Sequence, residues 1–398
     1  MKACLIYDFL TEYGGLERVM VNHANMLKEQ GFDIEILTCH YDKDVLKKMG
    51  FEGFKVTNIS SIKTPFEFLS LAFCFLGLNK IKKINADIFL SYSFPSNFLI
   101  RKKKAKRANY LNHFPHFLYF NMKDKIEWAS STQGLKRWTC VLISVFVKDW
   151  LKRLDQRLIK KNNLNFVNSK FTKKGLDKLY KIDTILSYPM LDPIFSPSKE
   201  RIKENFIFSS SRIIPGKKYE WLIEACSYMK NKIPLYISGQ YAERYKKSLE
   251  EQARRMNVKI KFLGKLSTED LIKYYTSANV FAFPTPKFEF GLVPAESLVC
   301  GTPIVVWADG GGQNEELLEG INGYGGKPHD LKDFAKKLDL LADGKFKEKN
   351  KEKIIASSKK FSYGEIKKNF IKEMMSLFIA TDFRSSQKKT IAMDNCID

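Results

Sequence analysis

Two cations lie close together directly after a predicted strand in the second half of the chain. Arg212 and Lys217 flank the Pro-Gly turn of the segment SRIIPGKK, which leads into a predicted helix. A helix start offers free N–H groups and a partial positive charge to an anion. Fixed positive charge there stabilises the negative charge that develops on a diphosphate leaving group. The segment predicts a diphosphate pocket, although a solvated basic turn explains the same residues.

Carboxylates and glycines follow two later strands. In PTPKFEFGLVPAE, we expect Glu296 to open a helix after Gly291, where its carboxylate can accept two hydrogen bonds from a ribose diol. The alternative is an acidic residue that complements the helix dipole. In DGGGQNEE, the successive glycines 310–312 precede a helix start and predict a backbone nest for an anion, with Glu315 nearby.

A further glycine turn lies near the N-terminus. Gly14 and Gly15 of EYGGLER separate a predicted strand from a predicted helix, and glycines let the backbone approach a ligand closely. Any tight βα turn uses such glycines, and the absence of G-x-G-x-x-G disfavours a nicotinamide-type site. The only D-x-D pattern, Asp42 to Asp44, lies in a Lys-rich helix start, so we expect a helix cap and no metal site.

These segments need elements that bring them to one place. Strand patterns alternate with helix patterns along the chain, which is typical of parallel sheets with helices on both faces. The first half predicts strands at Ala3–Tyr7, Asp33–Thr38, Asp87–Ser91, Ala108–Asn112 and Asn165–Val167. The second half predicts strands at Phe206–Ser209, Leu235–Ser238, Lys259–Phe262, Val280–Pro284 and Pro303–Val306. Ligands bind at the carboxyl ends of such strands, so we expect the chemistry between two facing sheets.

The chain of 398 residues is long enough for two domains. The proline-rich linker 188–199 separates an N-terminal Rossmann-like domain, 1–190, from a C-terminal domain, 200–360. We expect a helix in 361–380 to pack back toward the N-terminal domain, and the polar tail 381–398 to be disordered. Seven widely spaced cysteines predict no disulfide framework and a reducing, cytoplasmic compartment.

The net charge of +23 favours anionic partners, which include nucleic acid, anionic lipid and phosphorylated ligands. A Lys-rich solvated surface explains it equally well. Residues 121–161 predict a long helical stretch with one apolar and one basic face, typical of an interfacial helix and also of a helix packed on its own domain. The apolar segments Phe66–Leu78 and Trp138–Val147 are too short to span a bilayer.

In this order, the segments resemble glycosyltransferase family 4, the retaining nucleotide-sugar transferases with the GT-B fold. The resemblance covers residues 1–375 and is carried by YGGLERV, LNHFPHFLYF, FVNSKFTKKG, SRIIPGKKYEWLIEA, VKIKFLGKLSTEDLIKYYTSANVFAFPTP, FEFGLVPAESLVCGTPIVV and DGGGQNEELLEGINGY. It implies an α/β protein of two doubly wound, Rossmann-like lobes with an inter-domain cleft. It also implies that the donor substrate is a nucleotide-diphosphate sugar, with no cofactor and no metal.

The resemblance assigns roles to matching residues. Arg212 and Lys217 match the pair on the donor diphosphate, and His113 matches the histidine beside the donor sugar. Glu296 matches the second glutamate of the E-x7-E motif, which holds the ribose. The catalytic set so implied is His113, Arg212, Lys217 and Glu289. The donor-binding set is Gly14, Gly15, Arg212, Lys217, Phe290, Gly291, Leu292, Glu296, Gly311, Gly312 and Glu315.

Two positions depart from the family pattern. The first glutamate of E-x7-E would fall at Phe288, whereas the carboxylate here is Glu289, one residue later. Either the loop shifts so that Glu289 reaches the sugar hydroxyls, or that contact is missing. His116 occupies the position at which relatives with an H-x-P-x-R pattern carry arginine.

The resemblance predicts a retaining hexosyltransferase, nearest to the mannosyltransferase-like branches. It would move a mannose- or glucose-type hexose to a glycan or lipid-linked acceptor, with the leaving phosphate as the base. The basic segments 101–107 and 150–161 add an anionic membrane surface as a partner, at the inner face of a membrane. The alternative is a non-catalytic or nucleic-acid-binding protein on a GT-B-like scaffold. No nucleic-acid-binding module is recognisable, so we expect no nucleic-acid partner.

Overall fold

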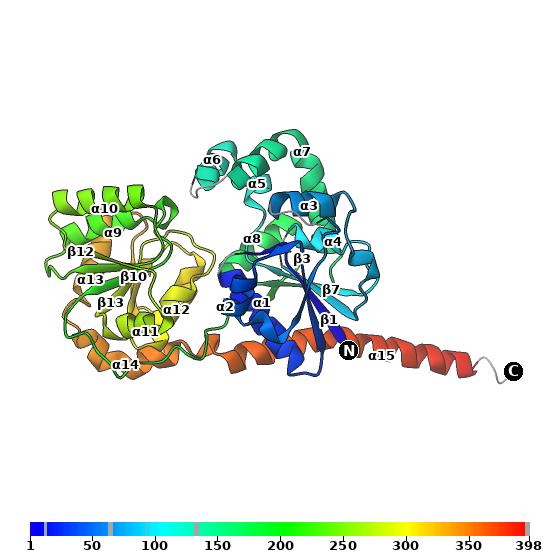
Figure 1. Cartoon of the computed structure of the whole chain (residues 1–398). Helices are drawn as coiled ribbons and strands as arrows, with labels where there is room; N and C mark the ends of the chain where they lie inside the picture. Colours follow the sequence, from blue (N-terminus) through cyan, green and yellow to red (C-terminus); the bar gives the residue numbers. More distant parts are fainter. Residues whose placement is uncertain (12–13, 63–66, 93, 131–134, 395–398) are drawn as a thin grey trace.

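The computed structural model describes residues 1–11, 14–62, 67–92, 94–130 and 135–394. Two α/β lobes lie side by side, each built on its own parallel sheet, and the long C-terminal helix α15 runs along the N-terminal lobe (Figure 1). The alternation of strand and helix patterns predicted this architecture. The predicted strands are all present, with ends that differ by one or two residues.

The N-terminal sheet has seven strands, and every pairing is parallel. In spatial order they are β5 (Lys55–Asn58), β3 (Asp33–Thr38), β1 (Lys2–Ile6), β6 (Ile88–Tyr92), β7 (Lys106–Leu111), β8 (Leu164–Val167) and β9 (Ile185–Leu186). Strand β1, between β3 and β6, is buried on both faces, as expected for a parallel sheet covered on both sides. A separate two-stranded sheet pairs β2 (Phe9–Leu10) with β4 (His40–Tyr41).

Helices cover both faces of this sheet. One face packs against α1 (Gly15–Lys28), α2 (Lys43–Met49) and α15 (Tyr363–Asp394). The other packs against α3 (Glu67–Phe75), α4 (Ser96–Leu99) and the second half of α7 (Leu135–Lys160). Helix α8 (Lys170–Tyr180) follows β8, and Ser169 caps its start by accepting the Thr172 N–H at 3.0 Å.

The C-terminal sheet has six parallel strands. In spatial order they are β12 (Ile260–Gly264), β11 (Leu235–Ser238), β10 (Ile207–Ser210), β13 (Val280–Phe283), β14 (Ile304–Trp307) and β15 (Gly323–Gly326). One face packs against α9 (Tyr219–Tyr228), α10 (Glu243–Arg255) and α13 (Leu331–Asp339). The other packs against α11 (Thr268–Ser277), α12 (Leu292–Val299) and α14 (Lys345–Ser357). Short 3-10 turns are η1 (Phe51–Gly53), η2 (Ile81–Lys83), η3 (Pro215–Lys217), η4 (Gly312–Glu315) and η5 (Lys359–Phe361).

Helices α5 (His116–Tyr119), α6 (Met122–Ser130) and α7 project above the N-terminal lobe (Figure 1). Helix α7 bends at Val147, whose φ of −124° and ψ of 17° are not helical. Beyond the bend, Leu158 and Ile159 are buried in the lobe, as the packed-helix interpretation predicted. Before the bend, large apolar side chains remain exposed. No described helix carries an 18-residue stretch apolar enough to cross a membrane.

Helix α15 returns the chain to the N-terminal lobe. Ile366, Phe370 and Met374 are buried in the core that α1 shares, and the Phe370 ring stacks on His23 with centroids 4.0 Å apart. The helix continues to Asp394, whereas we expected a disordered tail from residue 381. Residues 381–394 contain no glycine or proline, so a helix begun by the packed residues can propagate through them. Residues 395–398 lie outside the described part.

Candidate active site between the lobes

The predicted diphosphate cations lie at the carboxyl end of β10. After Ser210, Arg212 leads into η3, and Lys218 (φ 58°) turns the chain into α9. The Nζ atom of Lys217 lies 3.6 Å from the centroid of the Phe288 ring. Burial lowers the pKa of Lys217 to about 7, while the nearby Glu289 carboxylate raises it and Arg212 lowers it. An arriving anion would restore the charge of this desolvated ammonium.

Glu289 faces the N-terminal lobe. Its Oε1 atom lies 3.5 Å from Nε2 of His116, the first residue of α5. The ring of His113 is stacked on that of His116, with centroids 4.3 Å apart. Burial raises the pKa of Glu289, but the His116 hydrogen bond and the positive charge of both histidines outweigh it and hold that pKa below its usual value. The loop therefore presents a carboxylate to two histidines from the other lobe.

Phe288 occupies the position that the family spacing would give to a glutamate. Its ring packs on Phe283 with centroids 5.7 Å apart and lies beneath Lys217. A carboxylate at position 288 would lie in that packed position. In this chain Glu289 takes the place between the lobes.

The glycine-rich segment supports the Glu289 loop. The Gly312 N–H donates to the Phe288 carbonyl at 2.7 Å, and a Cβ atom on Gly312 would lie 1.7 Å from the Glu289 carbonyl oxygen. The Gly311 N–H donates to the Asp309 carboxylate at 2.9 Å. Both N–H groups thus have acceptors within the protein. The Asp309 carboxylate takes the Gly311 N–H, and a backbone carbonyl takes that of Gly312.

Helix α12 begins at Leu292, with Gly291 as its N-cap, and not at Glu296 as expected. Pro294 fits the first turn, where no N–H is needed for an intrahelical bond. Glu296 consequently lies in the second turn and is 2% exposed. Its Oε2 accepts a hydrogen bond from the Tyr275 hydroxyl at 3.0 Å, and its Oε1 accepts one from Nη2 of Arg18 at 2.7 Å.

Glu315 connects the two lobes. Its oxygens accept the Lys170 N–H at 3.0 Å and the Phe171 N–H at 2.9 Å, both at the start of α8. The Tyr188 hydroxyl, from the linker, donates to the same carboxylate at 2.7 Å. A carboxylate at a helix N-terminus satisfies free N–H groups and complements the dipole. Glu315 therefore caps a helix of the opposite lobe.

The predicted site residues form three groups where the lobes meet. The first joins Arg212, Lys217, Phe288 and Glu289 to His113 and His116. The second joins Gly15 and Arg18 to Leu292 and Glu296. The third joins Glu315 to the start of α8, and Phe290 packs nearby on Tyr188 and Phe361. The two-sheet interpretation predicted that these segments lie close together.

Two residues of these groups had no role predicted from the sequence. Arg18 lies in the first turn of α1, where a cation opposes the helix dipole. That unfavourable position is the signal that could have identified it as a residue with a partner elsewhere. His116 was noted only as a departure from the family pattern, and the sequence predicted no contact for it.

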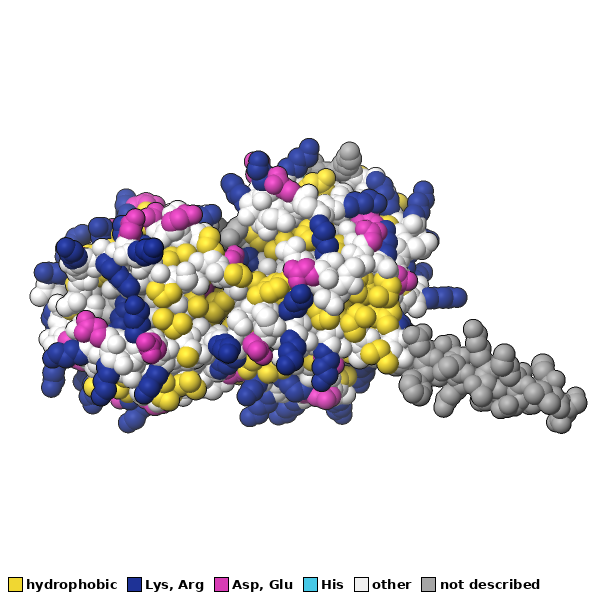
Figure 2. All heavy atoms as spheres, turned by 90° about the horizontal axis from the view of Figure 1, so that it is seen from below, with side chains coloured by type: hydrophobic (Ala, Val, Ile, Leu, Met, Phe, Trp, Pro, Cys, Tyr) yellow, Lys and Arg dark blue, Asp and Glu magenta, His cyan; other side chains and the backbone are white. Residues whose placement is uncertain are grey.

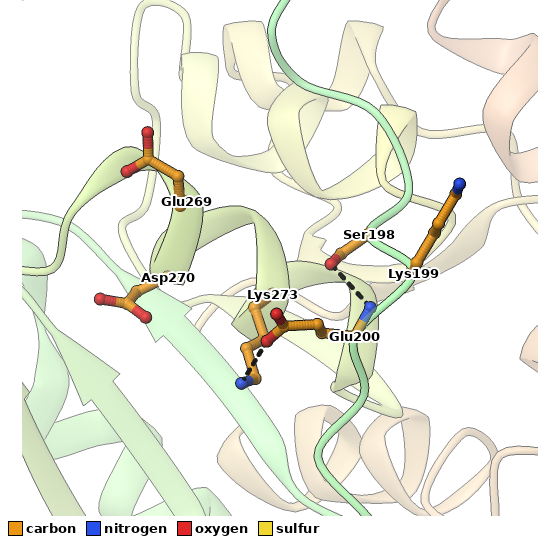
Figure 3. Close-up of a pocket in the computed structure, with 6 residues that line it drawn as sticks. All are labelled: Ser198, Lys199, Glu200, Glu269, Asp270 and Lys273. Carbon is orange, nitrogen blue, oxygen red and sulfur yellow. Dashed lines mark hydrogen bonds and ion pairs between the residues drawn. The ribbon is translucent and has the colours of Figure 1, made fainter.

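The described surface also has a depression of about 410 Å³ on the C-terminal lobe (Figure 3). No predicted site residue lines it. Glu200 and Lys273 in its wall form an ion pair at 2.7 Å, and Ser198 accepts the Glu200 N–H at 3.1 Å. Because no predicted site residue lines this depression, we do not take it as the candidate site.

The D-x-D segment, Asp42 to Asp44, lies at the start of helix α2. Asp42 is the N-cap of α2 and accepts the Val45 N–H at 3.0 Å, which confirms the predicted helix cap. Within the residues that the structure describes, no group of three or more His, Cys, Asp or Glu side chains could hold a metal ion.

Two family models match the chain, one on each lobe. The model "Glycosyltransferase Family 4" matches residues 13–186, and "Glycosyl transferases group 1" matches residues 192–361. An uncharacterized glycosyltransferase of Haemophilus influenzae is 23% identical over 82% of this chain and 86% of its own length. The mouse alpha-1,3/1,6-mannosyltransferase ALG2 is 21% identical over 78% of this chain and 80% of its own length.

Other relatives match a shorter part. The D-inositol 3-phosphate glycosyltransferase of a Mycobacterium strain is 37% identical over 83 residues, 21% of this chain, so the chain matches 19% of that relative's length. Among solved structures, sucrose-phosphate synthase of Thermosynechococcus elongatus has a TM-score of 0.73 and 16% identity, over 95% of this chain and 99% of that one. Anabaena HepE, in complex with UDP and glucose, has a TM-score of 0.71 and 16% identity, over 94% and 100%. These likenesses extend over both lobes.

Proposed function

Because this chain belongs to the family 4 glycosyltransferases and has their GT-B fold, we propose that it transfers a hexose from a nucleotide-diphosphate sugar to an acceptor hydroxyl. One observation carries the proposal. Arg212, Lys217 and Glu289 of the C-terminal lobe gather opposite His113 and His116 of the N-terminal lobe. This arrangement offers cations to a diphosphate and hydrogen-bonding side chains to a sugar.

Arg212 and Lys217 hold the donor diphosphate in this proposal. As the bond between the anomeric carbon and the phosphate oxygen breaks, negative charge grows on the diphosphate, and fixed cations stabilise it. The low pKa of Lys217 supports this role, because an anion that binds beside it restores the ammonium charge. Lys217 is thereby charged most fully when the diphosphate is present.

Transfer with retention assigns the remaining roles. The acceptor hydroxyl attacks the anomeric carbon from the face that the diphosphate leaves, and a leaving phosphate oxygen takes the hydroxyl proton. Glu289 and His113 hold sugar hydroxyls so that the anomeric carbon faces the acceptor. No metal is needed in this scheme, since side-chain cations neutralise the diphosphate.

The donor sugar is a mannose- or glucose-type hexose, and the acceptor is a glycan or lipid-linked hydroxyl. The mouse relative is named as a mannosyltransferase, and the Anabaena structure contains UDP and glucose, which supports this choice.

Calorimetric titration with UDP, GDP and ADP, each with EDTA present, tests the donor class. We expect one nucleotide to bind in the micromolar range, roughly −8 kcal/mol, without added metal. The sugar nucleotides of that base are then offered with oligosaccharide acceptors, and NMR of the product reports its anomeric configuration. Indifference to all three nucleotides would end the proposal, and an inverted product would end the retaining mechanism.

We also propose that the enzyme works at the inner face of a membrane, with α7 against the lipid. Before and around its bend, α7 exposes Leu142, Val145, Phe146 (80%) and Trp150 (62%). An exposed apolar patch of this kind is typical of an interaction site. Arg153 and Arg157, one and two turns after Trp150, are exposed as well and would meet anionic headgroups.

Three cations of the basic segment 101–107, which we expected to face lipid as well, bind backbone carbonyl groups. Arg101 donates to the Phe98 carbonyl at 3.0 Å, Lys103 to the Ile84 carbonyl at 2.5 Å and Arg107 to the Lys161 carbonyl at 2.7 Å. The segment connects α4 to β7. These three side chains donate hydrogen bonds to backbone carbonyl groups of nearby turns. Their role is structural, which also weakens the nucleic-acid alternative.

The nucleic-acid alternative has little other support. On the face seen in Figure 2, Lys and Arg side chains are spread over both lobes, with Asp and Glu among them. A nucleic-acid-binding surface typically gathers its cations on one face or stripe.

A further inference from the structure

The N-terminal turns of α1 and α12 lie against each other between the lobes. A Cβ atom on Gly15, the first residue of α1, would lie 4.0 Å from Cδ1 of Leu292, the first residue of α12. Both helices direct free N–H groups and positive dipole ends toward this junction. Arg18 is a cation in the same turn of α1, where the dipole disfavours it.

Arg18 meets its counter-ion on the other lobe. Its Nη2 atom donates to Oε1 of Glu296 at 2.7 Å, and this carboxylate is almost fully buried. A buried carboxylate is costly unless it is paired and hydrogen-bonded. Arg18 therefore compensates the charge of Glu296, and it can do so only while the lobes are closed.

A second carboxyl group near this pair does not compete for the cation. Burial raises the pKa of Glu316 well above its usual value and so favours its neutral form. Tyr275 donates its hydroxyl to the other oxygen of Glu296 at 3.0 Å. The Glu296 carboxylate is thus hydrogen-bonded from two sides, by a residue of each lobe.

We propose that Arg18 is a positioning residue for donor recognition, because its hydrogen-bonded ion pair holds the Glu296 carboxylate in a fixed orientation for the ribose diol when the lobes are closed. The inference rests on the proposed function, in which Glu296 receives the ribose. A carboxylate offers about four lone-pair positions. Arg18 and Tyr275 occupy two of them, which leaves two acceptor positions for the 2′- and 3′-hydroxyls.

This arrangement couples ribose recognition to lobe closure. When the lobes separate, Glu296 loses its cation and its fixed orientation, and its affinity for the diol falls. By linkage, a bound ribose favours the closed state by the same factor. The N-terminal lobe thus contributes to the reading of the ribose without touching it.

A pair of nucleotides tests the role of Arg18. The probes are the nucleoside diphosphate that wild type binds best among UDP, GDP and ADP, and its 2′-deoxy form. We expect wild type to bind the 2′-deoxy form about tenfold more weakly, as for one lost hydrogen bond to a charged group. In Arg18→Ala the ratio of the two dissociation constants should fall toward one, and the ribonucleotide should bind about tenfold more weakly.

Three further variants test whether the effect of Arg18→Ala depends on the Arg18–Glu296 pair. Glu296→Gln should lose the same discrimination, and Arg18→Lys should recover part of it, because lysine supplies charge without the planar fork of arginine. Lys28→Ala removes an exposed cation from the last turn of the same helix and should keep the wild-type ratio. If Arg18→Ala lowers the unfolding temperature, Arg18→Gln replaces it in the comparison.

The outcomes separate the two ideas. A folded Arg18→Ala protein with the wild-type ratio overturns the positioning role, even if both nucleotides bind more weakly, because equal weakening indicates a phosphate contact. Tighter ribonucleotide binding in Arg18→Ala also overturns it, since Arg18 would then compete with the ribose. A wild-type protein that binds no nucleoside diphosphate overturns the proposed function and this inference with it.

Discussion

Oε1 of Glu289 lies 3.5 Å from Nε2 of His116, although the two residues belong to different lobes. The contact brings the carboxylate of the C-terminal lobe to His116, the first residue of α5, and to the His113 ring stacked on it. It also explains the one-residue shift from the family spacing. Position 288 is filled by a phenylalanine beneath Lys217, and the following residue reaches across the interface.

Glu289→Gln tests whether this carboxylate contacts the donor sugar. The variant keeps the side-chain size but removes the charge that His116 and a sugar hydroxyl would bind. We expect kcat/KM to fall about 10- to 100-fold, as for a lost hydrogen bond to a charged group. Steady-state assays of released nucleoside diphosphate measure it. Moving the carboxylate in Phe288→Glu/Glu289→Ala should not restore activity, and an unchanged kcat/KM in Glu289→Gln would contradict the role.

Arg212→Ala and Lys217→Ala should each remove transfer and leave the fold intact. The cations are expected to stabilise charge that develops as the donor bond breaks, so each loss should cost about 10²- to 10³-fold in rate. Single-turnover assays measure the chemical step, and circular dichroism checks the fold. Lys259→Ala, at an exposed lysine of the same lobe, should behave as wild type. Wild-type turnover in either site variant would remove the residue from the catalytic set.

The pKa of Lys217 predicts a pH dependence of nucleotide binding. Burial lowers this pKa to about 7 in the empty site, and a bound diphosphate should raise it again. Above pH 7, binding should therefore take up about one proton, and affinity should fall up to about tenfold per pH unit. Titration at pH 8.5 in two buffers of different ionisation enthalpy measures the uptake.

Lys217→Arg is the control for this effect, because arginine stays charged at that pH. Its binding should show no proton uptake from this position. The lowered pKa of Lys217 also makes the stability of the folded protein depend on pH. The unfolded chain binds this proton below about pH 10.4, whereas the empty folded protein does not until about pH 7. Without a bound nucleotide, the contribution of Lys217 to the stability of the folded protein therefore decreases as the pH falls from about 10.4 to about 7. Equal uptake in both proteins would contradict the prediction.

Phe146→Glu/Trp150→Glu tests the lipid-facing surface of α7. Both side chains are exposed, so their change should leave the fold unaltered, and each aromatic ring withheld from lipid should cost about 1.5–3 kcal/mol of binding. Flotation with anionic vesicles at low salt measures the loss. Leu340→Glu, at an exposed leucine of the C-terminal lobe, is the matched control. Wild-type protein that stays with the soluble fraction would exclude this membrane contact.

Phe370→Ala should destabilise the N-terminal lobe. The ring is fully buried and stacks on His23, so its removal should cost about 3–5 kcal/mol of unfolding free energy. Urea unfolding followed by tryptophan fluorescence measures it, with exposed Lys368→Ala expected to stay within about 0.5 kcal/mol. A loss below about 1 kcal/mol would mean that α15 contributes little to the lobe.

The sequence by itself determined the lobes and the position of the cations between them. Strand patterns, turn glycines and prolines act over a few residues, so they identified five strands of each main sheet but not the short strands β5, β9 and β15. Because parallel strands present their carboxyl ends at one edge, they also indicated that Arg212 and Lys217 face the same interface as Glu289. The helix that begins at Leu292 shows the limit of local patterns, since its start was expected four residues later.

Only the tertiary structure decided the partners of these side chains. Arg18 with Glu296, His116 with Glu289, and Glu315 with the start of α8 all join segments distant in sequence. It also decided that Arg101, Lys103 and Arg107 bind carbonyl groups and that Asp309 accepts the Gly311 N–H. The physical reason is that a charge or an N–H group is satisfied by any suitable partner that folding brings near. The types and spacing of neighbouring residues do not specify which one arrives.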